Sequence, residues 1–536
     1  MRAYLATSIG VACTAALVLP VSQPSDALAA PPVAAHSTTE PDIATAVPGS
    51  TESVPLTAIG SRRSHGTTSE QGVTRRQVRP FSLLGVVWDD ADAEFHGTVQ
   101  VRTRATATHD WSDWQDLETH NQEHGADPGT EEHDSGTVHG STAPLWVGGS
   151  DGVELRARAT REDDEDGTAP APLPQGLRLE LIDPGEEPPG EETTDADRTD
   201  AGETDAGETD AGEAATGGKG STGEDSTEES GTEEQGGIDE QGGTDEQGGF
   251  DEQGGFEGGG TEESGTGEDE QGGTTDADAP GPLAAYQRAA LAPMSAAESE
   301  SSSADEGLAA LGAREIPALT KSASAARVTT AAAKKKTAPR PRIVTRRGWG
   351  ANESLRERRF RYTGTVKAAF VHHSATGNNY TCKQAPSVLR GIYRYHVKSS
   401  GWRDFGYNFA IDKCGNIYEG RAGGVAKPVL GAHTLGFNTN TVGIAVLGTY
   451  SRTNPSTAAT TAVARLTAWK LGLRGVNPKG KVTLTSGGSG KYAKGKRVRM
   501  NTISGHRDGF ATDCPGSRLY KKLGTVRTKA ARYQGR

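Results

Sequence analysis

The sequence lacks any apolar run long enough to cross a membrane as a helix. Hydrophobic residues make up only 33% of its 536 residues, and aromatic residues 5%. A spanning helix needs roughly 20 consecutive apolar residues, and even the stretch "IGVACTAALVLPV" near the N-terminus falls short of that. The composition therefore excludes a transmembrane segment, and it also excludes one continuous core over the whole length.

The same N-terminal stretch has the features of a signal peptide. Arg2 precedes the apolar run, and the small residues "ALAA" follow it. This order is typical of a segment that is cleaved during secretion, here near Ala29. We predict a signal peptide over residues 1–29 and a secreted mature chain.

Cysteine is scarce as well, with 4 residues in the whole chain. One of them, Cys13, leaves with the signal peptide. An odd number remains, so these three cannot all pair with one another: Cys382, Cys414 and Cys514. At least one is free or bound to something else.

Acidic residues are scarce in the last part of the chain, and basic residues are outnumbered in the rest. From Arg340 to Arg536 there are 36 Lys and Arg but only 7 Asp and Glu, a net charge of +29, while the rest carries 21 against 64, a net charge of −43. A basic domain attracts anionic polymers. Nucleic acid is one of these, but no nucleic-acid-binding motif accompanies the charge and a secreted protein rarely meets it, so we expect no nucleic-acid partner.

The acidic charge is concentrated in Gly-rich repeats between Glu186 and Asp278. "TDAGE" occurs three times there and "DEQGG" four times, and such repeats bury too little apolar surface to offset the entropy of ordering. Calcium-binding repeats are the alternative, but they need a nine-residue period that is absent here. An Ala- and Ser-rich stretch follows, and we predict one long disordered linker over residues 186–341.

Short alternating segments between residues 80 and 185 predict a small all-β domain of unknown function. In "TVQVRTRA", Val99 and Val101 alternate with polar residues, as in a half-buried strand. The domain is rich in tryptophan, which favours packing in a small core over a surface that stacks on sugars. The tryptophans are Trp88, Trp111, Trp114 and Trp146.

Strand and helix patterns alternate in residues 342–536 and predict an α/β domain. "AAFVHH" and "TVGIAVLG" are typical of buried strands, and "YNFAIDKCGNIYEG" of a hairpin. "APSVLRGIYRYHV" and "TAATTAVARLTAWKLGL" have helical spacing. His396 falls on the apolar face of the first helix, so we interpret it as a core histidine.

Five motifs of this domain stand in the order and spacing of a known family: "FVHHSAT", "GWRDFGYNFAID", "IYEGR", "GAHTLGFNTNTVGIAVLG" and "ISGHRDGFATDCPG". From about residue 343 to 522 the chain resembles the peptidoglycan recognition proteins, also called type 2 N-acetylmuramoyl-L-alanine amidases. The resemblance implies a mixed-sheet fold and zinc-dependent hydrolysis of the amide bond between N-acetylmuramic acid and L-alanine in peptidoglycan. The alternative is a recognition module that binds muropeptides without cleaving them, as relatives do when the zinc cysteine is replaced.

The unpaired cysteine also favours a metal on chemical grounds. A free exposed thiol is a liability in an oxidising compartment, whereas zinc binds His and Cys, and a catalytic site keeps three protein ligands and one water. His506 and Cys514 flank a loop long enough to bring both to one ion, and His372 at a strand end would complete the set. The family places its zinc on residues that match these three.

The resemblance also implies roles for other residues near the zinc. Tyr407 and Thr512 match catalytic positions that stabilise the oxyanion, and Thr512 stands where some relatives have Lys. His373 points to the opposite face of its strand from His372, so we expect it to support the site or the wall of the substrate groove. His433, in "GAHT", either contacts substrate or is structural.

The two remaining cysteines are expected to pair. A Cys382–Cys414 disulfide would close a loop of about 30 residues and contribute about 3 kcal/mol, while the short disulfide of animal relatives is absent. The implied partners are peptidoglycan and muropeptides, with anionic wall polymers drawn by the positive charge, and the implied location is outside the cell or at the cell wall. Because the linker has no recognisable chemistry, we expect the chain from Pro341 onward to be catalytically sufficient.

Overall fold

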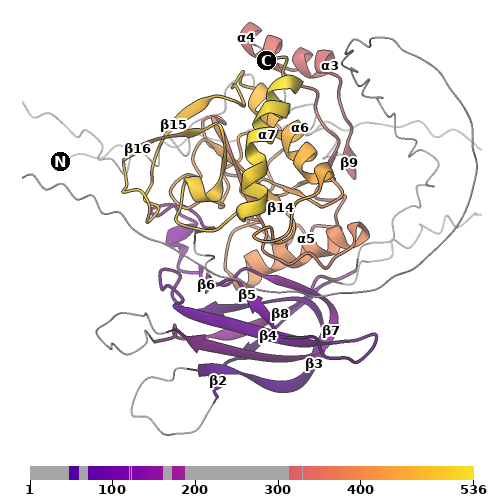
Figure 1. Ribbon diagram of the computed structural model, residues 1–536, viewed down its shortest axis with the longest axis vertical. Coiled ribbons are helices and arrows are strands. Elements are labelled where there is room, and N and C mark those ends of the chain that lie inside the picture. Colours follow the sequence, from indigo (N-terminus) through magenta and orange to yellow (C-terminus); the bar gives the residue numbers. More distant parts are fainter. Residues whose placement is uncertain are drawn as a thin grey trace, which may run out of the picture.

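The computed structural model describes residues 48–59, 70–119, 121, 123–160, 172–186, 313–328 and 330–536. They form an all-β front domain, residues 48–186, and an α/β back domain, residues 313–536 (Figure 1). The predicted signal peptide and the acidic repeats lie outside the described residues. Within the described ranges, no helix is both long enough and apolar enough to pass through a bilayer.

The front domain is all-β, as predicted, and its strands form one antiparallel sheet in the order β1-β8-β3-β7-β4-β5. The long strand β3 pairs with β7 on one side and β8 on the other, and short strands β2 and β6 also pair with β3. The strands are β1 (Ser50–Pro55), β2 (Thr57–Ala58), β3 (Glu70–Trp88), β4 (Gly97–Ala105), β5 (Gln115–Leu117), β6 (Gly140–Ser141), β7 (Leu145–Ala159) and β8 (Arg178–Asp183).

This sheet begins before residue 80, the boundary that the sequence suggested. Strand β1 starts at Ser50, and β3 starts at Glu70. Residues 74–77 of β3 are all exposed, so this part of the strand carries no alternation of apolar and polar residues. The pattern that predicts a half-buried strand is therefore missing in this part of β3.

Two of the four tryptophans are buried and two are not: Trp88 packs in the front domain's own core and Trp146 in the core that the two domains share. Trp88 is fully buried and Trp146 is 5% exposed. Trp111 and Trp114 are partly exposed, and arginines lie over their rings, with the guanidinium of Arg75 4.4 Å from the Trp111 centroid. Core packing thus explains half of the tryptophan content.

The back domain contains a seven-stranded mixed sheet in the order β17-β11-β14-β12-β13-β10-β9. Its four strands from β17 to β12 run parallel, and the predicted hairpin is β12–β13. The strands are β9 (Glu315–Ile316), β10 (Ile343–Val344), β11 (Ala368–His373), β12 (Phe409–Ile411), β13 (Ile417–Glu419), β14 (Thr441–Val446) and β17 (Ile503–Gly505), beside a separate pair, β15 (Lys481–Thr485) and β16 (Arg497–Asn501).

Helices cover both faces of this sheet. On one face, α6 (Thr457–Gly472) and α7 (Ser517–Tyr533) pack on a core that includes Val371 and Ile444. On the other face lies α5 (Ala385–Arg394), which continues into a π-helical turn, Tyr395–Ser399. The two helices that the sequence predicts, α5 and α6, are confirmed, and α7 was not predicted.

Part of the predicted linker is ordered. Strand β9 and two short helices, α3 (Lys321–Ala326) and α4 (Ala331–Lys336), precede residue 341. The hydroxyls of Thr320 and Thr330 accept hydrogen bonds from the first turns of these helices, and alanine has the highest helix propensity. This Ala-rich segment was predicted to be flexible because of its composition, but it forms two capped helices.

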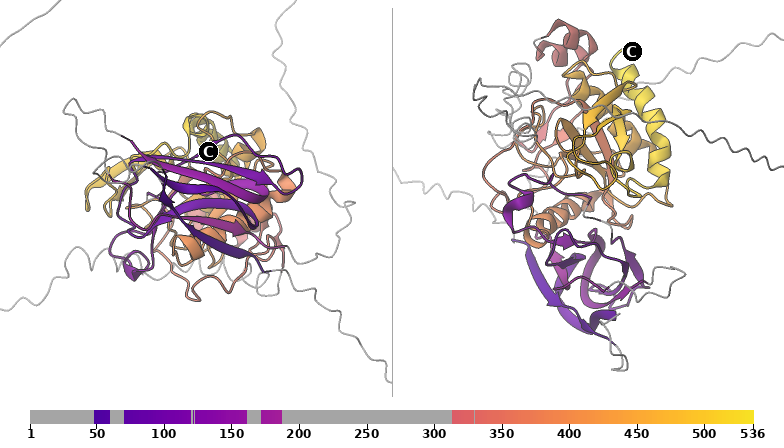
Figure 2. Two further views of the ribbon diagram at one scale, coloured as in Figure 1. Left: turned by 90° about the horizontal axis from the view of Figure 1, so that it is seen from below. Right: turned by 90° about the vertical axis from the view of Figure 1, so that its left-hand side faces the viewer.

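The two domains share a core across α5. Leu83 of the front sheet belongs to the same buried cluster as Leu389 and Ile392 of α5, and Figure 2 shows the front sheet packed beneath this helix. The hydroxyl of Tyr395 donates toward the carbonyl oxygens of Val86, at 3.2 Å, and Thr142, at 3.0 Å. A Cβ on Gly85 would lie 2.4 Å from that hydroxyl. The back domain is therefore not the isolated unit that the long linker suggested.

Cys382 and Cys414 form a disulfide, as expected, with Cα atoms 6.2 Å apart and a sequence separation of 32. The bond joins the start of α5 to the β12–β13 turn. Since α5 carries the domain interface, we expect the bond to stabilise the arrangement of both domains.

Replacing both cysteines by alanine should lower the free energy of unfolding by about 3 kcal/mol, because the unfolded chain regains the entropy of an open loop of about 30 residues. Urea denaturation followed by circular dichroism measures this change. Reducing the unmodified chain should give the same loss, and reducing the double variant should give none. A loss well under 1 kcal/mol would show that the bond adds little.

Candidate metal centre

Two predicted ligands lie side by side because their strands are parallel neighbours. Strand β11 pairs with β17 in a register that sets Val371 opposite Gly505. His372 and His506 are the next residues along, so both stand at the carboxyl ends of adjacent strands. Both side chains are fully buried, and their ring centroids are 4.6 Å apart.

The third predicted ligand, Cys514, reaches the same place through the loop after His506. Its Sγ lies 3.8 Å from Nδ1 of His372, and it is fully buried. The loop closes on itself, because Arg507 N donates to the carbonyl oxygen of Cys514 at 3.0 Å. The structure thus brings His372, His506 and Cys514 together.

A fourth member, His124, comes from the front domain and was missed by the sequence analysis. Its Nε2 lies 3.2 Å from Nδ1 of His506 across 382 positions of sequence. The potential ligand atoms of all four residues lie within 4.8 Å of one another. Nothing in the sequence links the loop "QEHGADPG", which has the composition of a turn, to His506.

The four residues fit a zinc ion. From the Zn–N and Zn–S lengths, two ligand atoms of one tetrahedral zinc lie roughly 3.3–3.6 Å apart, close to the 3.2 Å and 3.8 Å found here. Burial lowers the pKa of His372 and His506 well below the ordinary value, so both are neutral, as metal ligands must be.

His373 points away from this cluster, as alternation predicts. Its Nδ1 accepts a hydrogen bond from Tyr450 N at 3.3 Å, and its Nε2 lies 3.6 Å from a carboxylate oxygen of Glu118. Burial lowers the pKa of His373 to about 4. It lies between the back domain and a front-domain carboxylate.

The other two histidines are enclosed in the protein. His433 is fully buried, and its ring nitrogens contact the hydroxyls of Thr434, at 3.0 Å, and Thr441, at 3.5 Å. Its ring stands edge-on to His372 with centroids 5.3 Å apart, which favours the structural alternative. His396 is 2% exposed and accepts a hydrogen bond from Gly406 N, in agreement with a core histidine.

The two predicted catalytic residues lie at the edge of the cluster. The ring of Tyr407 is 5.3 Å from that of His372, and burial raises the pKa of its hydroxyl, which is thus a neutral donor. The Thr512 hydroxyl accepts from Cys514 N at 3.1 Å and donates to a carboxylate oxygen of Glu123 at 2.8 Å. Glu123 is a second residue that the sequence analysis missed, and burial raises its pKa to about 8.

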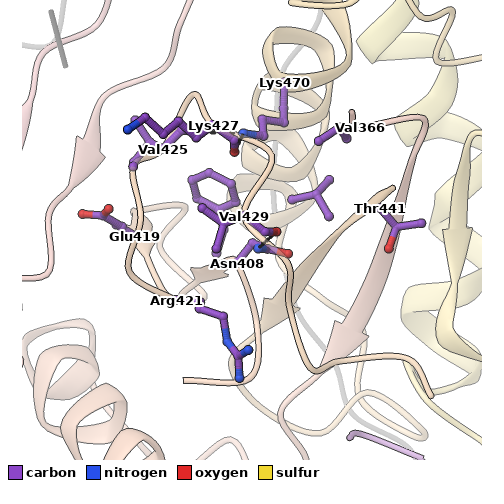
Figure 3. Close-up of a pocket in the computed structure, with 12 residues that line it drawn as sticks. Val366, Asn408, Glu419, Arg421, Val425, Lys427, Val429, Thr441 and Lys470 are labelled. Atoms are coloured by element: carbon purple, nitrogen blue, oxygen red, sulfur yellow. Dashed lines mark hydrogen bonds between the residues drawn. The ribbon is translucent and has the colours of Figure 1, made fainter. Parts of the chain in front are cut away.

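A small cavity elsewhere in the back domain is too small to be a substrate site. It measures about 10 Å³ and is lined by residues that include Asn408, Thr441 and Lys470 (Figure 3). The ammonium of Lys470 donates to the carbonyl oxygens of Val425 and Lys427 at 2.7 Å each. Such a volume holds about one water molecule, which excludes this cavity as a substrate site.

Two families match separate parts of the chain. Residues 362–517 match the family N-acetylmuramoyl-L-alanine amidase. Residues 36–175 match the family described as Rv3811 N-terminal galactose-binding domain-like. The first match covers most of the back domain, and the second most of the front domain.

Similar proteins match the back domain. Peptidoglycan-recognition protein SC2 of Drosophila simulans is 32% identical over 185 residues, which are 34% of this chain and 85% of that protein. Peptidoglycan recognition protein 1 of Bos indicus is 32% identical over 180 residues, 33% of this chain and 80% of that protein. The solved structure of wild-type Drosophila PGRP-LB matches 34% of this chain and 92% of its own, with 25% identity and a TM-score of 0.28.

With most of the length of such relatives matched at this identity, and with an amidase match over the same region, the chain belongs to the peptidoglycan recognition protein family of type 2 amidases.

Proposed function

We propose that the back domain hydrolyses the amide bond between N-acetylmuramic acid and L-alanine in peptidoglycan, with zinc held by His372, His506 and Cys514. One observation carries the proposal: two neutral imidazoles and a thiol converge at the carboxyl ends of adjacent parallel strands. The alternative is a non-catalytic module that binds muropeptides. Because the zinc cysteine is present and lies beside His372, we favour the enzyme.

In this proposal zinc supplies Lewis acidity and a water activated near neutral pH. The chain's own residues do the rest. Burial lowers the pKa of His372 and of His506, so both are neutral at pH 7. The loop from His506 to Cys514 holds the sulfur in position. The Tyr407 hydroxyl, a neutral donor, would stabilise the oxyanion that forms from the amide carbonyl.

The charge of the back domain fits this substrate. The stem peptides of peptidoglycan carry carboxylates, and anionic polymers accompany it in cell walls, so a net charge of +29 from Arg340 to Arg536 draws the domain to both. This attraction weakens as salt rises. We place the protein outside the cell or at the cell wall, where peptidoglycan is reached.

Cys514→Ala should abolish hydrolysis and weaken zinc binding by at least roughly tenfold, because the loss of a ligand costs no less than the loss of its outer-shell partner. In the cobalt-substituted chain, the near-ultraviolet thiolate-to-cobalt absorption should disappear. The matched control is the Cys382→Ala and Cys414→Ala double variant, which removes the two disulfide cysteines and should keep the thiolate absorption. Thiolate absorption that persists in Cys514→Ala would remove this residue from the ligand set.

Tyr407→Phe should lower kcat by roughly 10²–10³-fold, or about 2.7–4 kcal/mol, because it removes one oxyanion donor and keeps the ring. The measurement is release of stem peptides from a soluble muropeptide, identified by mass spectrometry, at equal zinc content. Thr512→Val is the comparison and should lower kcat less, since Thr512 is a neutral hydroxyl beside the metal. A Tyr407→Phe enzyme as fast as the unmodified chain would move the donor to another residue.

A further inference from the structure

A segment of the front domain leaves its sheet and lies along the back domain. We call residues 123–139 the plug (Figures 1 and 2). The back domain hydrogen-bonds to the backbone of the plug: Leu435 N donates to the carbonyl oxygen of Glu123 at 2.9 Å. The side-chain amide of Asn438 donates to the carbonyl oxygen of Gly125 at 2.7 Å. These contacts seat the start of the plug beside the metal cluster.

The acidic side chains of the plug meet polar groups of the back domain. Arg421 donates to both carboxylate oxygens of Glu132, at 2.8 and 2.7 Å, and both side chains are buried. Asp127 accepts from Gly436 N at 2.7 Å and from Asn438 at 2.8 Å. The plug thus satisfies donors of the basic domain with carboxylates, the same groups that a stem peptide carries.

At the metal cluster the plug occupies two positions that catalysis needs. The Glu123 carboxylate takes the hydrogen bond of Thr512. The next residue, His124, places its Nε2 3.2 Å from Nδ1 of His506. A catalytic zinc keeps one coordination position open, whereas four protein ligands make a closed site. With His124 in place, all four potential ligands are buried.

We propose that His124 is a fourth protein ligand of the metal and that the plug keeps this chain latent. The inference rests on the proposed function of the same site. Opening the site requires only that the plug withdraws and that a water molecule takes the coordination position of the His124 nitrogen. No covalent bond breaks, and no oxidant, reductant or further reactant is consumed.

X-ray absorption spectroscopy at the zinc edge tests the ligand assignment without any assay of activity. The zinc-loaded full chain should show three imidazole ligands and one sulfur, and His124→Ala should show two imidazoles, one sulfur and a lighter donor. His133→Ala is the matched control, because His133 lies in the same plug and its side chain is 23% exposed. It should keep three imidazoles. Two imidazoles in the unmodified chain would overturn the assignment and leave a His124–His506 hydrogen bond in its place.

Release of zinc to a chelator and hydrolysis of a soluble muropeptide test latency. His124→Ala should release zinc at least roughly tenfold faster than the unmodified chain, and it should hydrolyse the muropeptide faster than both the unmodified chain and His133→Ala. Equal hydrolysis by the unmodified chain and His124→Ala would overturn latency while the proposed function stands. Three imidazoles in the unmodified chain without hydrolysis by any variant would instead overturn the proposed function and leave the ligand assignment intact.

Discussion

The parallel pairing of β11 with β17 is the constraint on which the metal centre depends. Its register puts Val371 opposite Gly505, and the next residues, His372 and His506, therefore end side by side. A slip of one residue would turn His372 to the other face of the sheet. Gly505 makes the close packing possible, because a Cβ there would lie 2.7 Å from the ring of Tyr520 and 2.9 Å from Pro515.

Burial determines the chemistry of this centre. It holds His372 and His506 neutral, and it raises the pKa of the Cys514 thiol and of the Tyr407 hydroxyl. Two residues of the front domain contact the cluster, Glu123 at Thr512 and His124 at His506. The pKa values of the site therefore depend on how the two domains pack, and movement of the front domain would change both the packing and these pKa values.

The back domain could be predicted largely from the sequence because its patterns are local. Buried runs predicted β11 and β14, and helical spacing predicted α5 and α6. His372 was predicted at the end of a strand, whereas His506 and Cys514 were predicted from the unpaired cysteine and from the resemblance to the family's zinc ligands. The structure brings the three together.

Other features could not be predicted, for physical reasons. Residues 74–77 of β3 are exposed on both faces, so this part of the strand has no alternation to detect. Helices α3 and α4 depend on threonine caps in a stretch whose composition suggested a flexible linker. His124 meets His506 across 382 positions, and no periodicity of either segment reports a contact between domains. Tertiary packing alone brings them together.

The claim that both domains meet at one metal is tested most directly by diffraction from crystals of the zinc-loaded full chain, with data collected on both sides of the zinc absorption edge. The account predicts a single strong anomalous peak enclosed by His124, His372, His506 and Cys514. A peak bound by the three back-domain residues and a water, with His124 turned away, would contradict it, as would the absence of any peak at this place.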